Sequence, residues 1–210
     1  MDRRTLLLGD WSPWLRDPLD VLRIAYVIGV PAVALVRHDY PLNLTVSAVA
    51  VWAVRFVLLP RAYDLAFCLA FGLTGWGDAL GLYERWGDYD LVVHTLAPFC
   101  VAPVLYILLA RLELLPDLRD TSERHHYVGV FLVTFALGLA VGALWEIVEF
   151  TSDHFTGSHL VHGEQDTATD LVADGGGALL GGVLLVVWAV YGWGSVRRIP
   201  GVNRAEETSA

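Results

Sequence analysis

The sequence predicts an all-α integral membrane protein, a polytopic bundle of about six transmembrane helices with both termini in the cytoplasm. Hydrophobic residues make up 55% of the 210 positions and charged residues only 18%, whereas soluble domains average about 45–50% and about 25%. The apolar residues fall in long, nearly uncharged runs, each close to the roughly 20 residues that a transmembrane helix needs. Arg residues concentrate in alternate connections between these runs, a pattern typical of a multi-spanning membrane protein.

The six apolar runs are expected to cross the membrane one after another. The predicted spans are residues 20–36, 42–59, 63–83, 89–110, 127–150 and 169–193. Residues 1–19 contain Trp11 and Trp14, which are expected to anchor this segment at the membrane surface. Its apolar run, Leu6–Leu8, is too short for a signal-peptide core, so no cleavage is expected. Residues 20–193 are therefore the predicted transmembrane domain, and residues 194–210 a polar cytoplasmic tail.

The distribution of positive charge predicts the orientation. All 14 basic residues are Arg, and with cytoplasmic termini twelve of them fall in or beside inside segments. Only Arg37 and Arg85 then remain outside. Because an excess of Arg marks cytoplasmic segments, we expect a multi-pass protein of the inner cell membrane with both termini inside.

The composition also excludes several classes of protein. A disordered chain, a coiled coil and a secreted disulfide scaffold do not have long uncharged apolar runs with only two cysteines. Cys68 and Cys100 both lie inside such runs, so neither a disulfide nor a CxxC site is indicated. The net charge of -9 comes without any basic face, so no nucleic-acid partner is expected. The expected partners are membrane lipids.

Ionisable side chains are predicted to gather at one depth in the membrane. A charged group deep in a bilayer costs about 2.5–3.5 kcal/mol on insertion scales, so each one needs a reason. Four predicted spans carry such groups near their outer ends: Asp78 in the third, Asp90 and His94 in the fourth, Glu146 and Glu149 in the fifth, Asp170 and Asp174 in the sixth. We expect the residues of the fourth, fifth and sixth spans to form a polar pocket in the outer half of the bundle, while Asp78 is either near them or simply facing water at the interface.

The spacing of these residues places them on shared helix faces. Asp90 and His94 are four residues apart, and Glu146 and Glu149 are three apart, so each pair lies on one face of its helix.

The sixth span begins with an acidic stripe. Asp166, Asp170 and Asp174 follow one another at intervals of four, provided that the helix begins before them. Thr167 and Thr169 are candidate caps for the start of this helix.

Small residues predict how the last two spans pack. Gly177 and Gly181 form a GxxxG pattern that allows another helix to approach closely. Gly138 and Gly142 have the same spacing in the fifth span, so we expect the two glycine pairs to face each other. This packing sets the glutamates of the fifth span against the aspartates of the sixth.

So many carboxylates at close range must hold protons, pair with Arg85 or a protonated His, or bind a metal cation. The candidate metal ligands are Asp90, His94, Glu146, Glu149, Asp170 and Asp174. This donor chemistry suits Mg²⁺, Mn²⁺ or Zn²⁺, and the sequence does not choose among the three. Glu146, Glu149 and His94 are the candidate catalytic residues, as proton acceptors in a metal-assisted reaction.

Simpler interpretations stay open for each group. Asp90 and His94 could form one interhelical hydrogen bond, Glu146 and Glu149 a protonated pair, and Asp170 part of a helix start. His154, His159 and His162 lie in a polar loop predicted at 151–168 and are either solvated or additional ligands. Trp76 and Trp145 are either interfacial anchors or residues that line a pocket.

Three motifs in order resemble a known family. They are Tyr89-Asp90-x-x-x-His94, Leu144-Trp145-Glu146-x-x-Glu149-Phe150 and Asp166-Thr167-x-x-Asp170-Leu171-x-x-Asp174. This order resembles the YjdF-like family of small inner-membrane proteins of unknown function and is similar, more distantly, to VanZ-like membrane proteins. The resemblance spans about residues 63–185 and implies that the acidic residues and His94 of the three motifs belong together.

Three functions are compatible with these residues. The first is a cation-dependent site that binds or acts on a lipid or an envelope-linked ligand from the outer leaflet. The second is an accessory membrane protein whose polar network only fixes helix packing. The third is a cation or proton transporter, which is poorly supported because the inner half of the bundle is expected to offer mainly Arg55.

Overall fold

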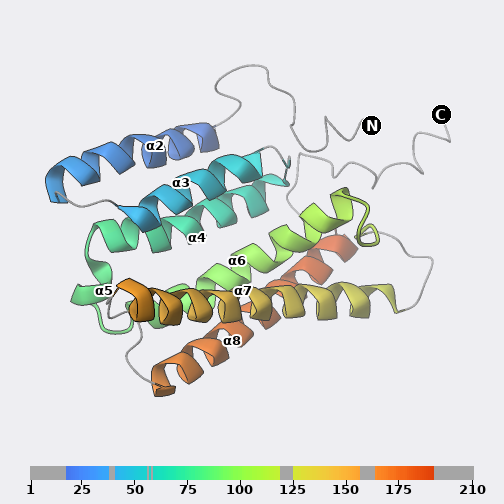
Figure 1. Cartoon of the computed structure of the whole chain (residues 1–210). Helices are drawn as coiled ribbons and strands as arrows, with labels where there is room; N and C mark the ends of the chain where they lie inside the picture. Colours follow the sequence, from blue (N-terminus) through green and yellow to red (C-terminus); the bar gives the residue numbers. More distant parts are fainter. Residues whose placement is uncertain are drawn as a thin grey trace.

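The computed structural model describes residues 18–37, 41–55, 57, 59–118, 125–156 and 164–191. Every regular element within these ranges is a helix, which confirms the predicted all-α bundle (Figure 1). The helices are α2 (Pro18–Arg37), α3 (Leu42–Arg55), α4 (Arg61–Ala79), α5 (Leu82–Arg85), α6 (Tyr89–Arg111), α7 (His126–Thr156) and α8 (Glu164–Tyr191). The six predicted spans correspond to the six long helices. Residues 1–17 of the segment predicted at 1–19, and the whole tail predicted at 194–210, lie outside the described residues.

Four of the six long helices are long and apolar enough to cross a membrane by themselves: α2, α6, α7 and α8. Helix α3 has 14 residues, about 21 Å at 1.5 Å per residue, and is shorter than the roughly 30 Å hydrocarbon core. Helix α4 has 19 residues, but Asp64 and Asp78 interrupt its apolar sequence. At 31 residues, α7 is longer than predicted, and its length of about 46 Å at 1.5 Å per residue exceeds the roughly 30 Å hydrocarbon core.

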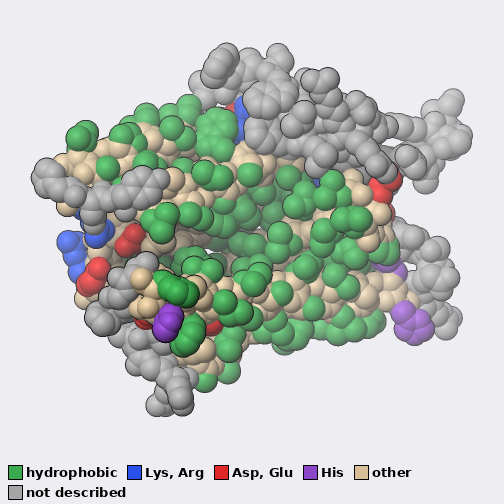
Figure 2. Space-filling model, viewed as in Figure 1, with side chains coloured by type: hydrophobic (Ala, Val, Ile, Leu, Met, Phe, Trp, Pro, Cys, Tyr) green, Lys and Arg blue, Asp and Glu red, His purple; other side chains and the backbone are tan. Residues whose placement is uncertain are grey.

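The long helices form two layers (Figure 1). In the first layer α3 packs against α2 and α4. In the second layer α6, α7 and α8 pack against one another, and the contact of α4 with α6 joins the layers. Hydrophobic side chains cover most of the central surface in Figure 2, while charged side chains and His gather at its two ends. This distribution is what a bilayer around the middle of the bundle requires.

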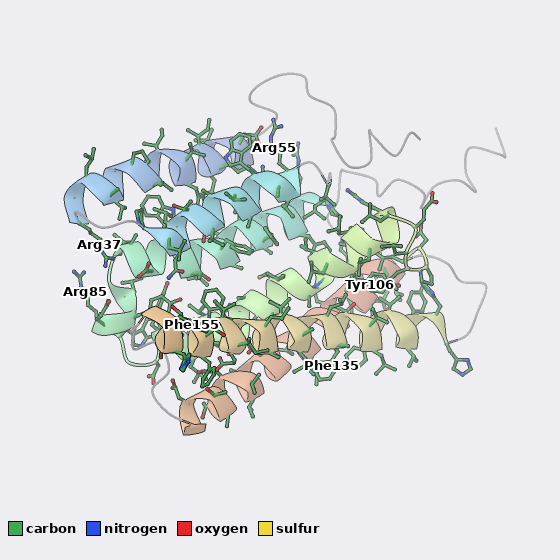
Figure 3. All side chains as sticks on the ribbon, in the orientation of Figure 1. Arg37, Arg55, Arg85, Tyr106, Phe135 and Phe155 are labelled. Carbon is green, nitrogen blue, oxygen red and sulfur yellow. The ribbon has the colours of Figure 1, made fainter. Side chains whose placement is uncertain are left out.

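The helices run alternately between the two ends of the bundle. Arg37, Arg85 and Phe155 lie at one end, and Arg55 lies at the other (Figure 3). The first end, where α6 and α8 begin and α7 finishes, is called the cluster end below. Helix α2 begins and helix α8 ends at the opposite end (Figure 1). The two Arg predicted to be outside are therefore on one side of the bundle.

A buried ionic network ties α2, α3 and α4 together at the opposite end. Asp20 accepts hydrogen bonds from Arg23 Nη1 at 3.0 Å and from Arg55 Nε and Nη2 at 2.8 and 2.9 Å. Arg23 also pairs with Asp64 and donates from Nε to the Val51 carbonyl at 2.9 Å. The expectation that the inner half offers mainly Arg55 is therefore wrong. Asp20, Arg23 and Asp64 were missed because each lies in the first turns of its helix.

The glycines of α8 contact a different helix from the one predicted. A Cβ added to Gly177 would meet the backbone carbonyl of Thr95 on α6, and a Cβ added to Gly181 would meet the backbone carbonyl of Phe99. The prediction that this pair faces α7 is wrong. Asp174 and Ala178 of α8 face α7, where they lie against Gly142 and Gly138 respectively. On α8, the pair Gly177 and Gly181 and the pair Asp174 and Ala178 occupy adjacent faces. Helix α8 therefore contacts both α6 and α7 closely.

Candidate functional site

The structure brings the six predicted metal ligands together at the cluster end, where α6, α7 and α8 pack against one another. Helix α6 supplies Asp90 and His94 from its first turns, α7 supplies Glu146 and Glu149, and α8 supplies Asp170 and Asp174. We call these six residues the carboxylate–histidine cluster. Helix α8 begins at Glu164, early enough for the acidic stripe to lie on the helix. Thr167 and Thr169 consequently lie within α8, not at its cap.

His94 occupies the centre of the cluster, and its two ring nitrogens have different neighbours. Nδ1 lies 3.2 Å from Asp174 Oδ1. Nε2 lies 3.7 Å from Asp90 Oδ1 and 3.8 Å from Glu146 Oε1. The ring can donate a hydrogen from Nδ1 to Asp174, because a carboxylate only accepts hydrogen bonds. With a single hydrogen, on Nδ1, the ring would present the lone pair of Nε2 toward Asp90 and Glu146.

Three buried polar atoms of the cluster make no hydrogen bond within the described part of the chain. They are His94 Nε2, Glu146 Oε1 and Asp174 Oδ2. Their residues are only 3%, 7% and 1% exposed. An unpaired polar atom at such burial is costly, and an unpaired charge more so. The geometry is therefore open to a ligand that would complete these contacts.

Two sets of three residues are close enough to share an ion. The potential ligand atoms of Asp90, His94 and Asp170 lie within 4.8 Å of one another, and so do those of His94, Glu146 and Glu149. His94 belongs to both sets. Asp174 belongs to neither and contacts the other ring nitrogen of His94. A carboxylate that accepts the second N–H of a ligating His is the usual means of orienting that His.

Glycine at position 142 makes room for Asp174. A Cβ on Gly142 would overlap the carboxylate of Asp174, so only glycine allows this side chain to reach His94 between α7 and α8. On the same helix the Trp145 indole donates a hydrogen bond from Nε1 to Glu149 Oε1 at 2.8 Å. This bond, across one turn of α7, fixes the direction of the Glu149 carboxylate.

Comparison with known proteins gives a family. A family described as "Predicted membrane protein (DUF2238)" matches residues 21–191. The chain belongs to this family. Its matched region contains five of the six long helices in full, α2 except for its first three residues, and all six cluster residues. The match confirms the resemblance to a family of membrane proteins of unknown function that the three motifs predicted.

Other comparisons are less extensive. An uncharacterized protein from Thermotoga maritima is 30% identical over 99 residues, which is 47% of each chain. This DUF2238 member therefore aligns with about half the length of that relative. No solved structure matches the chain.

The candidate residues outside the carboxylate–histidine cluster lie separately from one another in this DUF2238 protein. The backbone carbonyl of Asp78 accepts a hydrogen bond from Arg37 Nη1 at 2.8 Å at the cluster end. Arg85 is exposed on α5, and His154 is exposed near the end of α7. His159 and His162 lie outside the described residues.

The two tryptophans that were candidates for lining a pocket have different surroundings. Trp145 lines a cavity beside the cluster. Trp76 packs against Tyr26 with ring centroids 6.2 Å apart and touches Gly29.

One aromatic residue near the cluster was not predicted. Tyr83 on α5 packs edge-on against Tyr89, with ring centroids 4.9 Å apart. Burial raises the pKa of Tyr83 above its ordinary range, and the nearby charge of Asp90 adds to the effect. Its place in a short connecting turn gave no sequence signal that it would lie near the cluster.

Proposed function

We propose that the carboxylate–histidine cluster is a divalent-cation site, through which this membrane protein binds or acts on a lipid or envelope-linked ligand. The observation that carries the proposal is the convergence of three buried atoms without hydrogen-bond partners among the described residues: His94 Nε2, Glu146 Oε1 and Asp174 Oδ2. A cation would offset the repulsion among five carboxylates that three helices bring together. Protonation alone would also reduce that repulsion, but Nε2 of His94 lies 3.7 and 3.8 Å from the nearest carboxylate oxygens, beyond ordinary hydrogen-bond distance.

The distances inside the cluster suit a shared cation. Two ligand atoms that each lie about 2.1 Å from a tetrahedral ion are about 3.4 Å apart. His94 Nε2 is 3.7 Å from Asp90 Oδ1 and 3.8 Å from Glu146 Oε1, too long for hydrogen bonds and close to this spacing. The donor set of one imidazole with several carboxylates fits Mn²⁺ or Zn²⁺ better than Mg²⁺, which prefers oxygen ligands throughout.

The six residues would then have two kinds of role. His94, Asp90, Asp170, Glu146 and Glu149 supply the candidate ligand atoms. Asp174 is a positioning residue, since it accepts the Nδ1 hydrogen and turns Nε2 toward the other carboxylates. If the site is catalytic, a carboxylate that does not bind the ion, Glu146 or Glu149, is the proton acceptor for a water activated by the metal.

A cation also explains how an acidic site could recognise a lipid headgroup. The cluster lies in helices with apolar surfaces, so lipids are the molecules next to it. Phosphate groups would be repelled by the carboxylates but attracted by a bound cation. The two Arg at this end do not substitute for the cation, since Arg85 is exposed on α5 and Arg37 is bonded to the Asp78 carbonyl.

We further propose that the cluster end faces away from the cytoplasm in the inner membrane. The support is the distribution of Arg, because twelve of the 14 belong to the opposite end or to segments expected on its side. The site would then be open to lipids and envelope precursors of the outer leaflet.

The test is the thermal unfolding midpoint of the purified protein with Mn²⁺, Zn²⁺, Mg²⁺ and a chelator. At a hundredfold excess over the dissociation constant, a cation stabilises the folded state by about 2.7 kcal/mol. For a chain of this size that corresponds to a rise of about 5–10 °C. Glu146→Gln should abolish the rise, and Glu84→Gln, at an exposed glutamate of the same end, should retain it. Equal responses of wild type and Glu146→Gln to every cation would contradict the proposal.

One alternative has an observation in its favour. The bond between His94 and Asp174 joins α6 to α8, so the cluster could serve helix packing alone. Under that alternative no cation changes the unfolding midpoint, and replacements that keep hydrogen bonding cost little, since such bonds average about 0.6 kcal/mol in membrane proteins.

Transport has less support. The charged network at the opposite end belongs to α2, α3 and α4 and its charges pair with one another. On α6 the buried residues between His94 and Arg111 are apolar apart from Tyr106 and Cys100.

A further inference from the structure

A cavity of about 260 Å³ lies beside the cluster, between α4 and α7 and over α6. Its walls are apolar almost throughout: Phe71 on α4, Val93, Pro98 and Val101 on α6, and Leu144 and Val148 on α7. The polar exceptions are Thr74, His94 and Asp174. The cavity therefore has apolar walls and touches two members of the carboxylate–histidine cluster.

The rim of the cavity is continuous with the surface that faces lipid. Leu144 and Val148 on α7 are 61% and 56% exposed, on a helix long and apolar enough to cross a membrane. At this depth the surrounding medium is hydrocarbon, which satisfies no polar group and enters apolar clefts readily. Water would gain few hydrogen bonds along such walls, because a buried water needs two to four polar partners.

We propose that this cavity binds a hydrocarbon chain of a membrane lipid, whose polar headgroup lies at the carboxylate–histidine cluster. The inference rests on the proposed function, since it names the substrate class of that same site. Two buried atoms carry it: His94 Nε2 and Asp174 Oδ2 make no hydrogen bond among the described residues, and both residues line the cavity. An occupant must be apolar along the walls and polar, or bridged by a cation, at this end.

The helix contacts explain why the cavity exists. Helices α4 and α7 both pack against α6, and the residues of α4 and α6 that border the cavity include the small Ala70 and Ala97. Opposite them, Trp145 forms a wall while its Nε1 is bonded to Glu149 at 2.8 Å. Trp145 therefore connects the apolar cavity to the cluster and would contact the chain near its headgroup.

The first experiment uses the wild-type protein in phosphatidylcholine vesicles that contain a phosphatidylglycerol with a photoreactive diazirine on one acyl chain. After irradiation, mass spectrometry maps the labelled residues. Bulk lipid reaches exposed positions such as Leu132, but Val93 and Val101 are only 6% and 7% exposed. A chain inside the cavity should therefore label Val93, Pro98 or Val101. Label confined to outward-facing positions would overturn the proposal.

A matched pair of variants tests the site itself. Ala97→Phe fills the cavity from α6 and should reduce labelling of Val93 and Val101 by at least about tenfold, the equivalent of 1.4 kcal/mol. Ala143→Phe, at an exposed position on α7 outside the cavity, should leave the labelling unchanged. Equal labelling in both variants would contradict the proposal. If Ala97→Phe fails to fold, the wild-type map alone decides.

A third measurement separates this inference from the proposed function. Labelling of Val93 and Val101 is repeated in Glu146→Gln, with Mn²⁺ and with chelator. If α6 is labelled while no cation raises the unfolding midpoint, the chain site stands and the cation site fails. If the midpoint responds to cation but α6 is never labelled, the cation site stands and the chain site fails.

Discussion

His94 and Asp174 are 80 residues apart in the chain, yet their side chains meet between α6 and α8, with Nδ1 3.2 Å from Oδ1. The contact requires Gly142 on α7, because a side chain there would overlap the Asp174 carboxylate. It leaves Nε2 of His94 directed at Asp90 and Glu146. This arrangement is the basis of the first two predictions.

Asp174→Asn should weaken cation binding less than Glu146→Gln does. The Asn carbonyl can still accept the Nδ1 hydrogen of His94, so the ring keeps its direction but loses the support of a negative charge. Replacing such an orienting residue typically costs about 10–100-fold in metal affinity, whereas Glu146→Gln removes a charged ligand. Isothermal titration with Mn²⁺ and Zn²⁺ measures the difference. A larger loss in Asp174→Asn would mean that Asp174 itself binds the ion.

Without cation, Glu146→Gln should raise the unfolding midpoint in chelator. Glu146 is 7% exposed and lies close to Glu149 and His94, so its charge is desolvated and repelled by neighbouring carboxylates. A neutral amide of the same shape removes that repulsion. Glu84→Gln is the control, since Glu84 is exposed and should leave the midpoint unchanged. A lower midpoint in Glu146→Gln would show that its charge stabilises the cation-free protein.

The ionic network at the opposite end should matter for folding and not for the cation response. Asp64→Ala leaves the buried Arg23 without one of its two carboxylates, and breaking a buried pair in this way costs about 3–5 kcal/mol. The unfolding midpoint should therefore fall strongly, while the rise on adding Mn²⁺ or Zn²⁺ stays as in wild type. Asp117→Ala is the control variant, because it replaces a half-buried aspartate at the same end. Loss of the cation response in Asp64→Ala would indicate that the two charged groups are coupled.

Gly177→Val should separate α6 from α8, and Gly176→Val should not. A Cβ at Gly177 meets the Thr95 carbonyl, whereas a Cβ at Gly176 meets nothing within 4 Å. Overfilling a packed contact costs about 1–3 kcal/mol, and the shift would also move Asp174 away from His94. We expect a lower unfolding midpoint and a weaker cation response in Gly177→Val only. Identical behaviour of the two variants would contradict the helix contact seen here.

Cysteine labelling tests the orientation. Cys68 and Cys100 are buried, so single cysteines at exposed positions can be labelled over a low background. Glu84→Cys at the cluster end should react with an impermeant maleimide added to intact cells. Glu113→Cys, exposed at the opposite end, should react only after permeabilisation. The reverse pattern would place the cluster on the cytoplasmic side.

The sequence predicted the long helices but not the burial of the charged residues near the starts of α2 and α4. The six long helices follow from apolar runs, because helix formation in a bilayer satisfies every backbone polar group within the segment. Which charges would be buried depends on contacts between helices. No prediction was made for Asp20 and Asp64 from the sequence, and only the packing of α2 against α3 and α4 encloses them.

The sequence by itself determined that the protein is a helical membrane bundle and that acidic residues and His94 collect toward the same end of it, since alternating spans of similar length bring alternate helix ends to one level. Tertiary structure alone decided that Asp174 contacts Nδ1 of His94, that Gly177 contacts α6, and that a cavity opens between α4 and α7. The physical reason is rotation about the helix axis. Residues one position apart differ by about 100° in direction, and only packing against specific neighbours fixes which face each helix turns inward.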